Sequence, residues 1–260
     1  MLKLLLFTQY IIFSLALTAE SSPENQLGQK GDLLLSDDFS VARDKKGTKL
    51  SKTFNARANQ GLWEKKENTY QSTWEPGVGH TPVMSYQGDF KNVIIECTFK
   101  YGSLDPKVDW HTQCFRIALD NRKLYTGHVL SAWANPNNDF IETGFLLQHI
   151  HKTKDKKIVD DILLDKQPLN YEADKWITVL LEVVNDEVLF QMEGQNIAYA
   201  KLDKLDVPKN LISLTLGKTW HQLQSFKVWK ATPNPHWESI KNDGLKNRLK
   251  FKSIPHNYKK

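Results

Sequence analysis

The chain has 260 residues, and its 35 Lys and Arg residues exceed its 30 Asp and Glu residues only slightly, which gives a net charge of +5. Much of the basic excess lies in 236–260 instead of being interleaved with aromatic residues on a folded face, so nucleic-acid binding is not expected. With two cysteines the chain has no disulfide framework, and its length suffices to bury a core without one.

The N-terminus reads MLKLLLFTQYIIFSLALTAESS, in which Lys3 precedes an apolar run from Leu4 to Leu17 and small residues surround Ala19. This order is typical of a secretory signal peptide, and the run is too short to span a membrane stably. We expect residues 1–19 to be cleaved. The mature protein is then expected to be secreted or periplasmic, without a transmembrane segment, and monomeric.

Between residues 32 and 233 the sequence consists of short β-rich runs separated by turn residues, and helical periodicity is nearly absent. The runs are DLLLSDDFS, GLWEKKENTYQST, NVIIECTFKYG, QCFRIALD, HVLSAWA, TGFLLQHIHK, KWITVLLEVVNDEVLFQMEGQNIAYA, NLISLTLG and LQSFKVWKA. About ten strands in some 200 residues predict an all-β domain, a two-sheet antiparallel β-sandwich over 32–233.

The clearest hairpin covers 176–193, where Asn185 and Asp186 supply the turn and Leu181 is paired with Phe190. Its second face mixes aromatic, aliphatic, carboxylate and amide side chains. A face exposed to solvent throughout would be more polar, so we expect it to be partly covered or to line a groove.

The two cysteines are predicted not to form a disulfide. If 92–101 and 112–120 are neighbouring strands, Cys97 lies on a buried face, whereas Cys114 lies on the face opposite Phe115. Two thiols on opposite faces of a sheet do not meet.

The pattern changes at Pro233 and Pro235, which end the predicted sandwich. The remaining tail, 234–260, is basic. A short helix within 236–249 would place three apolar residues against the domain: Trp237, Ile240 and Leu245. Beyond it we expect a fraying, solvated end, with adhesion to a membrane surface or polyanion as the alternative.

The order of several segments resembles a known family. These are the DDF opening, IIECTFKYG, CFRIALDN, FLLQHIHK, KWITVLLEVVNDEVLFQMEGQ and the closing LISLTLGKTWHQLQSFKVWKATPN. Together they resemble the concanavalin A-like jelly rolls, most closely the secreted bacterial domains of the 3-keto-disaccharide hydrolase type, related to glycoside hydrolase family 16. The resemblance covers about 32–233 and implies a jelly-roll fold and an activity on glycosides.

The resemblance also implies site residues. The family carries an arginine on the open face of the strand that matches CFRIALD, where Arg116 falls, and Gln148 matches the glutamine of a later Glu-x-Gln. Leu146 stands where that glutamate would be. The chain also lacks the strand that gives retaining family 16 glucanases two carboxylates about 5 Å apart. The resemblance therefore leaves catalysis open.

Arg116 has two interpretations. If 92–101 and 112–120 pair, Glu96 lies opposite it, and the two form a cross-strand ion pair. Alternatively, Arg116 is held in a groove to bind a sugar carboxylate, sulfate or keto oxygen, for which its planar fork is suited.

Histidines supply the candidate acid–base groups. His149 and His151 are two apart on a strand and share a face, where they could hold zinc or act as base and orienting group. A third ligand with clear spacing is lacking, so no metal site is predicted there, and the alternative is an exposed strand end. The candidate catalytic residues are His111, Arg116, His149 and His151.

Of eight tryptophans, those in loops or at strand ends are the ligand candidates, because a sugar ring stacks on an indole while its hydroxyls take hydrogen bonds. We expect Trp63, Trp176 and Trp229 to serve packing instead. The candidate substrate-binding residues are Trp74, His80, Glu96, Trp110, Trp133 and Gln148.

No cofactor is predicted beyond a structural calcium ion at Asp37 and Asp38, which would otherwise serve as turn residues. Three hypotheses remain for an exported, carbohydrate-handling protein. The first is a glycoside hydrolase with a groove built by Arg116, His111, Gln148, His149 and His151, in which a histidine acts as base and Arg116 stabilises negative charge on the sugar. The others are a non-catalytic carbohydrate-binding module and an adhesive envelope protein.

Overall fold

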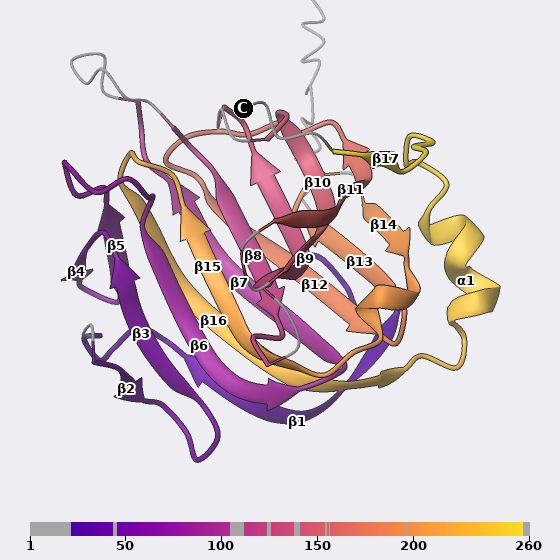
Figure 1. Cartoon of the computed structure of the whole chain (residues 1–260), viewed down its shortest axis with the longest axis horizontal. Coiled ribbons are helices and arrows are strands. Elements are labelled where there is room, and N and C mark those ends of the chain that lie inside the picture. Colours follow the sequence, from indigo (N-terminus) through magenta and orange to yellow (C-terminus); the bar gives the residue numbers. More distant parts are fainter. Residues whose placement is uncertain are drawn as a thin grey trace, which may run out of the picture.

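Two antiparallel sheets pack face to face in the computed structural model, with their strands curving together around the core (Figure 1). The structure describes residues 22–43, 46–104, 112–123, 126–137, 141–153, 155, 157–195 and 197–256. Within these residues one sheet has eight strands and the other has nine. The predicted two-sheet antiparallel β-sandwich is confirmed. The predicted signal peptide lies outside the described residues.

The eight-stranded sheet has the order β14-β13-β12-β7-β16-β5-β4, and β1 also pairs with β16. Its strands are β1 (Gly28–Asp37), β4 (Leu62–Lys66), β5 (Thr69–Thr73), β7 (Val93–Tyr101), β12 (Trp176–Val184), β13 (Glu187–Met192), β14 (Ala198–Lys201) and β16 (His221–Pro233).

The nine-stranded sheet has the order β17-β11-β10-β9-β8-β15-β6-β3-β2. Its strands are β2 (Thr48–Lys49), β3 (Asn55–Gln60), β6 (Val83–Phe90), β8 (Phe115–Asp120), β9 (Thr126–Asn135), β10 (Gly144–Lys152), β11 (Ile158–Gln167), β15 (Lys209–Leu216) and β17 (Ile254–Pro255). A short 3₁₀ helix, η1 (Asp203–Leu205), precedes β15.

Stacked aromatic pairs join the two sheets through the core. Phe99 of β7 stacks on Phe115 of β8 with ring centroids 3.9 Å apart. Two further stacked pairs cross the interface at 4.2 and 4.4 Å, and they are Phe145 with Phe190 and Tyr86 with Phe226. Because each ring comes from the inward face of its strand, these contacts fix which side chains of every strand face outward.

The predicted hairpin is confirmed, since Leu181 of β12 pairs with Phe190 of β13. Its second face is covered, as the mixed composition indicated. Leu27 and Trp237 pack there against the outward leucines of both strands. The Glu182 carboxylate accepts hydrogen bonds from the amide of Gly28 at 2.8 Å and that of Gln26 at 3.0 Å, which ties the N-terminal segment to the sheet.

The assumption that 92–101 and 112–120 are neighbouring strands is wrong. β7 pairs with β12 and β16, whereas β8 pairs with β9 and β15, so the two strands lie in different sheets. Cys97 is part of the central core, and Cys114 lies in a separate apolar cluster on the other side of the nine-stranded sheet. No disulfide joins these two described residues, as predicted, although the reason is their separation into two layers.

The C-terminal part differs from the predicted solvated tail. Helix α1 (Trp237–Gly244) buries Trp237 and packs Leu245, as expected, but Ile240 is 38% exposed. The expectation of a fraying end is wrong for 248–256, because this segment returns to the nine-stranded sheet, where β17 lies beside β11 (Figure 1). Among the described residues, none of the helices has the length and apolar character that a membrane crossing requires.

Candidate functional site

Arg116 occupies the middle of β8 and points to the outer face of the nine-stranded sheet, the side away from the core. Its Nε and Nη2 donate to the Thr215 hydroxyl at 3.2 and 2.7 Å, and Nη1 donates to His128 Nε2 at 3.3 Å. Its Cζ lies 4.6 Å from the centroid of the Trp133 ring. With only 9% of the residue exposed, the guanidinium is held in one orientation from three sides.

His128 is fixed by a second contact. Its Nδ1 lies 2.7 Å from Oδ1 of Asp120. Asp120 lies on the outward face of β8, as do Arg116 and Ala118. Because the guanidinium of Arg116 only donates hydrogen bonds, His128 Nε2 is the acceptor there, so the ring proton lies on Nδ1 and is donated to Asp120. We call Arg116, His128, Asp120, Trp133 and Thr215 the Arg116 cluster.

The strand register places small side chains next to this cluster. Ser131 of β9, Ala118 of β8, Ser213 of β15 and Ser85 of β6 are successive partners across four neighbouring strands. These residues form a low row beside the larger side chains of Arg116 and its partners. All four side chains are buried, so the row forms a floor between the larger side chains of this face.

Two polar atoms of this face are buried and have no hydrogen-bond partner among the described residues. They are the hydroxyl of Ser131 and the side-chain carbonyl of Asn59, whose amide nitrogen donates to Ser85 at 2.9 Å. Buried polar atoms are almost always paired in folded proteins. Unpaired oxygens on a polar face are therefore groups that a bound ligand could satisfy.

Gln148 and Trp133 are brought together with Arg116, as the sequence suggested. The Trp133 indole donates to Oε1 of Gln148 at 3.3 Å, and the amide nitrogen of Gln148 donates to Asp161 at 2.8 Å. His256 of the C-terminal segment lies 3.4 Å from both Gln148 and Asp161. The outer face is thus connected by hydrogen bonds from β9 to β11.

Glu96 does not lie opposite Arg116, and the predicted ion pair between them is wrong. The two residues belong to strands of different sheets, and the Glu96 carboxylate lies 3.1 Å from Lys30 Nζ and 3.7 Å from Lys227 Nζ. The reason is that β7 and β8 lie in different layers and meet only through core side chains such as Phe99 and Phe115.

His149 and His151 lie on the opposite side of β10 from Gln148, so grouping them with Gln148 on one surface is wrong. Neighbours along a strand point to opposite faces. His149 Nδ1 donates to the carbonyl of Val129 at 2.8 Å, and Nε2 lies 4.0 Å from Asp160. Burial lowers the pKa of His149, which keeps the ring neutral. The structure therefore does not bring these histidines to Arg116.

Trp74 and His80 lie in the connection between β5 and β6. The Trp74 indole donates to the carbonyl of Val78 at 2.9 Å, and the ammonium of Lys218 lies 5.1 Å from its ring. His80 is exposed, with Nδ1 2.8 Å from the carbonyl of Thr81. Trp110 and His111 lie outside the described residues. Roles in ligand binding or catalysis stay predictions for all four.

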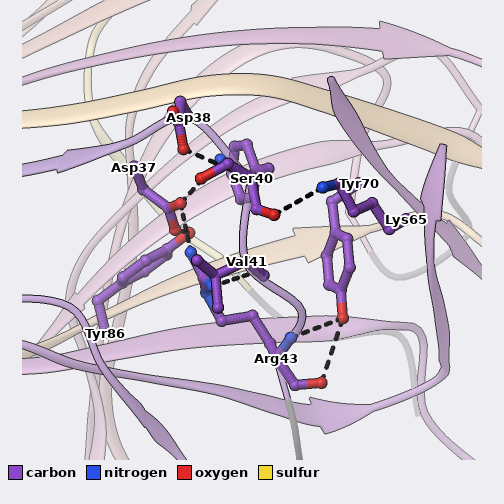
Figure 2. Close-up of polar contacts among 9 residues, drawn as sticks. Asp37, Asp38, Ser40, Val41, Arg43, Lys65, Tyr70 and Tyr86 are labelled. Carbon is purple, nitrogen blue, oxygen red and sulfur yellow. Dashed lines mark hydrogen bonds and ion pairs between the residues drawn. The ribbon is translucent and has the colours of Figure 1, made fainter. Parts of the chain in front are cut away.

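Asp37, proposed as a calcium ligand, faces into the sandwich (Figure 2). Its Oδ1 lies 2.5 Å from Nη2 of Arg43, and its Oδ2 accepts from the Tyr86 hydroxyl at 3.1 Å. Asp38 points away and accepts from the amide of Ser40 at 2.9 Å. The described residues contain no group of three or more His, Cys, Asp or Glu side chains placed to hold a metal ion. Calcium binding stays a prediction.

Sequence reasoning missed His128, Asp120 and Thr215. Asp120 carried a signal, because alternation along β8 places it on the same face as Arg116. His128 and Thr215 come from β9 and β15, whose pairing with β8 only the tertiary structure reveals.

A scan against models of known protein families finds no match, and a search of curated protein sequences finds none. Solved structures do match. A Bacillus subtilis protein of unknown function with a galectin-like fold superposes with a TM-score of 0.50 at 10% identity, covering 80% of this chain and 100% of that one.

Two carbohydrate-related structures superpose less closely. LamA of Z. galactanivorans, in complex with laminaritriose and laminaritetraose, has a TM-score of 0.49 at 9% identity and covers 78% of this chain and 100% of its own. Carbohydrate-binding module CBM66 of Bacillus subtilis has a TM-score of 0.45 at 8% identity and covers 70% and 97%. The superposition on the Bacillus subtilis structure of TM-score 0.50 shows that this chain has a galectin-like β-sandwich fold.

Proposed function

We propose that this protein binds carbohydrate on the outer face of its nine-stranded sheet, with the Arg116 cluster at the centre of the site. The observation that carries the proposal is the Arg116 guanidinium, stacked on Trp133 and hydrogen-bonded to Thr215 and His128. Sugar recognition relies on a few precisely placed polar groups, and here the buried Trp133 ring holds one of them, the guanidinium, in position. A preoriented guanidinium also favours a sugar that carries a carboxylate, sulfate or keto oxygen.

The surroundings of the cluster support this chemistry. The row of Ser131, Ala118, Ser213 and Ser85 gives this face a floor of small, mostly hydroxyl-bearing side chains beside the guanidinium. The buried oxygens of Ser131 and Asn59 accept hydrogen bonds that sugar hydroxyls donate. We also propose that the protein meets its glycan outside the cytoplasm, because residues 1–19 have the pattern of a signal peptide.

The test is binding of the chain from residue 20 onward to an array of neutral, uronate-containing and sulfated glycans, followed by titration calorimetry with the strongest hit. Arg116→Ala is expected to weaken binding at least about tenfold, and Arg116→Lys nearly as much, because lysine keeps the charge but loses the fork. Lys227→Ala, on the other sheet, is the control and keeps full affinity. Unchanged affinity of Arg116→Ala refutes the proposal, and no binding on the array favours the adhesive envelope role.

Glycoside cleavage of the 3-keto type is the second candidate, and the His128–Asp120 hydrogen bond favours it. An imidazole oriented by a carboxylate is the usual arrangement of a general base, and His128 Nε2 becomes available for this role when the Arg116 guanidinium, which donates to it here, turns to the sugar. Turnover of plain and 3-keto glycosides by the same protein tests it, with His128→Asn as the inactive variant. If the protein binds glycans but turns none over, only the binding function remains.

A further inference from the structure

Two hollows lie at one end of the sandwich, apart from the Arg116 cluster, and share one residue. The larger has a volume of about 540 Å³ and the smaller about 170 Å³, and Tyr171 lines both. Small-molecule sites occupy about 300–1,000 Å³, so the larger hollow has the size of a ligand site and the smaller that of a side pocket. Tyr171 is 38% exposed although it is aromatic.

The ridge between the hollows is the connection from β11 to β12, residues 168–175, and it is held at three points. The amide of Asn170 donates to Gln195 at 2.9 Å, and the amide of Asp174 donates to the carbonyl of Tyr101 at 2.9 Å. The Tyr171 ring packs edge-on against the Tyr101 ring with centroids 5.5 Å apart. The exposed phenol is therefore positioned before any ligand arrives, which lowers the entropic cost of binding.

The lining of the smaller hollow combines an indole with charged groups. Trp176 provides the aromatic wall, and Glu172, Lys175 and Glu193 surround it. The ammonium of Lys100 lies 5.0 Å from the centroid of the same indole ring, which helps to hold the ring in place. An aromatic face beside carboxylates and amides is the chemistry that grips a sugar ring and its hydroxyls.

The larger hollow is lined by apolar and polar residues together. Phe251 and Leu249 of the C-terminal segment are among the apolar ones, and Lys166 and Lys250 bring charge. Positively charged, negatively charged and amide side chains all occur around the two hollows. Such a lining suits an oligosaccharide, which is rich in hydroxyl groups, better than the acyl chain of a lipid.

We propose that the two hollows are adjacent subsites of a second carbohydrate site, in which an oligosaccharide crosses the Tyr171 ring from one hollow to the other. The site is separate from the Arg116 cluster and does not depend on it. The chain length follows from the geometry: the smaller hollow holds one sugar unit on Trp176, and the larger holds the units on the other side of Tyr171. Single sugars therefore bind much more weakly than chains that span both.

The experiment titrates the protein with oligosaccharides of increasing length, taken from the array hits, and with the matching monosaccharides. Tyr171→Ala is expected to weaken binding of the longer chains at least about tenfold, whereas Tyr171→Phe, which keeps the ring, stays within about threefold. Trp176→Ala is expected to abolish the gain from the added sugar unit. Leu62→Ala, at an exposed apolar residue of β4, is the surface control and leaves affinity unchanged. Thermal melts verify that each variant is folded.

Hydrogen exchange on the same complexes separates this site from the Arg116 cluster. An oligosaccharide bound at Tyr171 protects amides of 169–176, binds equally well to Arg116→Ala, and binds at least about tenfold more weakly to Tyr171→Ala. An oligosaccharide that binds only through Arg116 protects β8 and β9, and its affinity is unaffected by Tyr171→Ala. If every glycan that binds behaves in this way, the second site is overturned and the first site remains. Absence of any binding across the panel overturns the second site as well.

Discussion

Arg116 and Trp133 are direct partners across β8 and β9, and the guanidinium lies over the indole with its Cζ 4.6 Å from the ring centroid. The same type of pair occurs on the other sheet, where the Lys30 ammonium lies 3.8 Å from the centroid of Trp229. The two pairs differ in their surroundings. Arg116 is also hydrogen-bonded to Thr215 and His128, whereas Lys30 is one third exposed and contacts Glu96.

This difference predicts different consequences for two similar substitutions. Trp133→Leu removes the surface that holds Arg116 in place, so glycan affinity is expected to fall about fivefold to thirtyfold, equivalent to about 1–2 kcal/mol. Trp229→Leu, the matched control, leaves affinity unchanged. Titration calorimetry measures both, and equal losses in the two variants would show that the Arg116 cluster is not the site.

Breaking the buried ion pair of Asp37 and Arg43 is expected to destabilise the protein strongly (Figure 2). Both side chains are only 1% exposed, so Asp37→Asn leaves an uncompensated guanidinium in the core and is expected to lower the free energy of unfolding by about 3–5 kcal/mol. Replacing both partners, as Asp37→Leu with Arg43→Met, is expected to recover much of that loss. Asp38→Asn, at the exposed neighbour, should cost less than about 1 kcal/mol. Urea unfolding tests this, and a double variant no more stable than Asp37→Asn would contradict it.

The buried His221 is expected to make the free energy of unfolding depend on pH. Burial lowers the pKa of this histidine from 6.5 to about 4. Between pH 6.5 and pH 4 the unfolded chain therefore binds a proton that the folded protein does not, so the free energy of unfolding falls as the pH falls. The contribution reaches at most about 1.4 kcal/mol per pH unit.

The measurement compares urea unfolding of the protein and of His221→Asn at several pH values. The asparagine keeps a donor for the carbonyl of Thr219, which His221 Nδ1 contacts at 2.8 Å, but does not titrate. The difference in stability between the two proteins should shrink as the pH falls from 6.5 to 4. A constant difference would mean that His221 titrates normally in the folded state.

We predict that the C-terminal segment stabilises the folded protein, although its sequence has the composition of a solvated tail. Phe251 packs against the apolar cluster that contains Cys114 and Trp133, and Arg248 Nε lies 2.7 Å from the buried carboxylate of Asp165. Deleting 249–260 is expected to lower the unfolding midpoint and to speed hydrogen exchange in β11, which loses its pairing with β17. Phe251→Ala alone should cost about 1–3 kcal/mol. Lys252→Ala, at an exposed residue, is the control, and a truncated chain of unchanged midpoint would contradict the prediction.

The local pattern of the sequence was sufficient for most strands and for the hairpin of β12 and β13, because alternation with a period of two reports directly which face of a strand is buried. The same reasoning predicted that Arg116 points away from the core, on a sheet face that also carries Gln148 and Trp133. It failed for Glu96, because sequence proximity of two strands does not say whether they share a sheet. It also failed for His149, whose grouping with Gln148 ignored the alternation that it should have obeyed.

The sequence by itself determined the all-β architecture, the faces of its strands and the chemical types available for a site, since these depend on local periodicity and composition. Only the tertiary structure decided which outward residues meet. Thr215 reaches Arg116 from a strand 99 residues further along the chain, and Tyr171 divides two hollows, one of which is lined by a segment from the C-terminal end. Such contacts depend on strand order and on the connections between layers, which are fixed by long-range packing of the core and leave no local signature in the sequence.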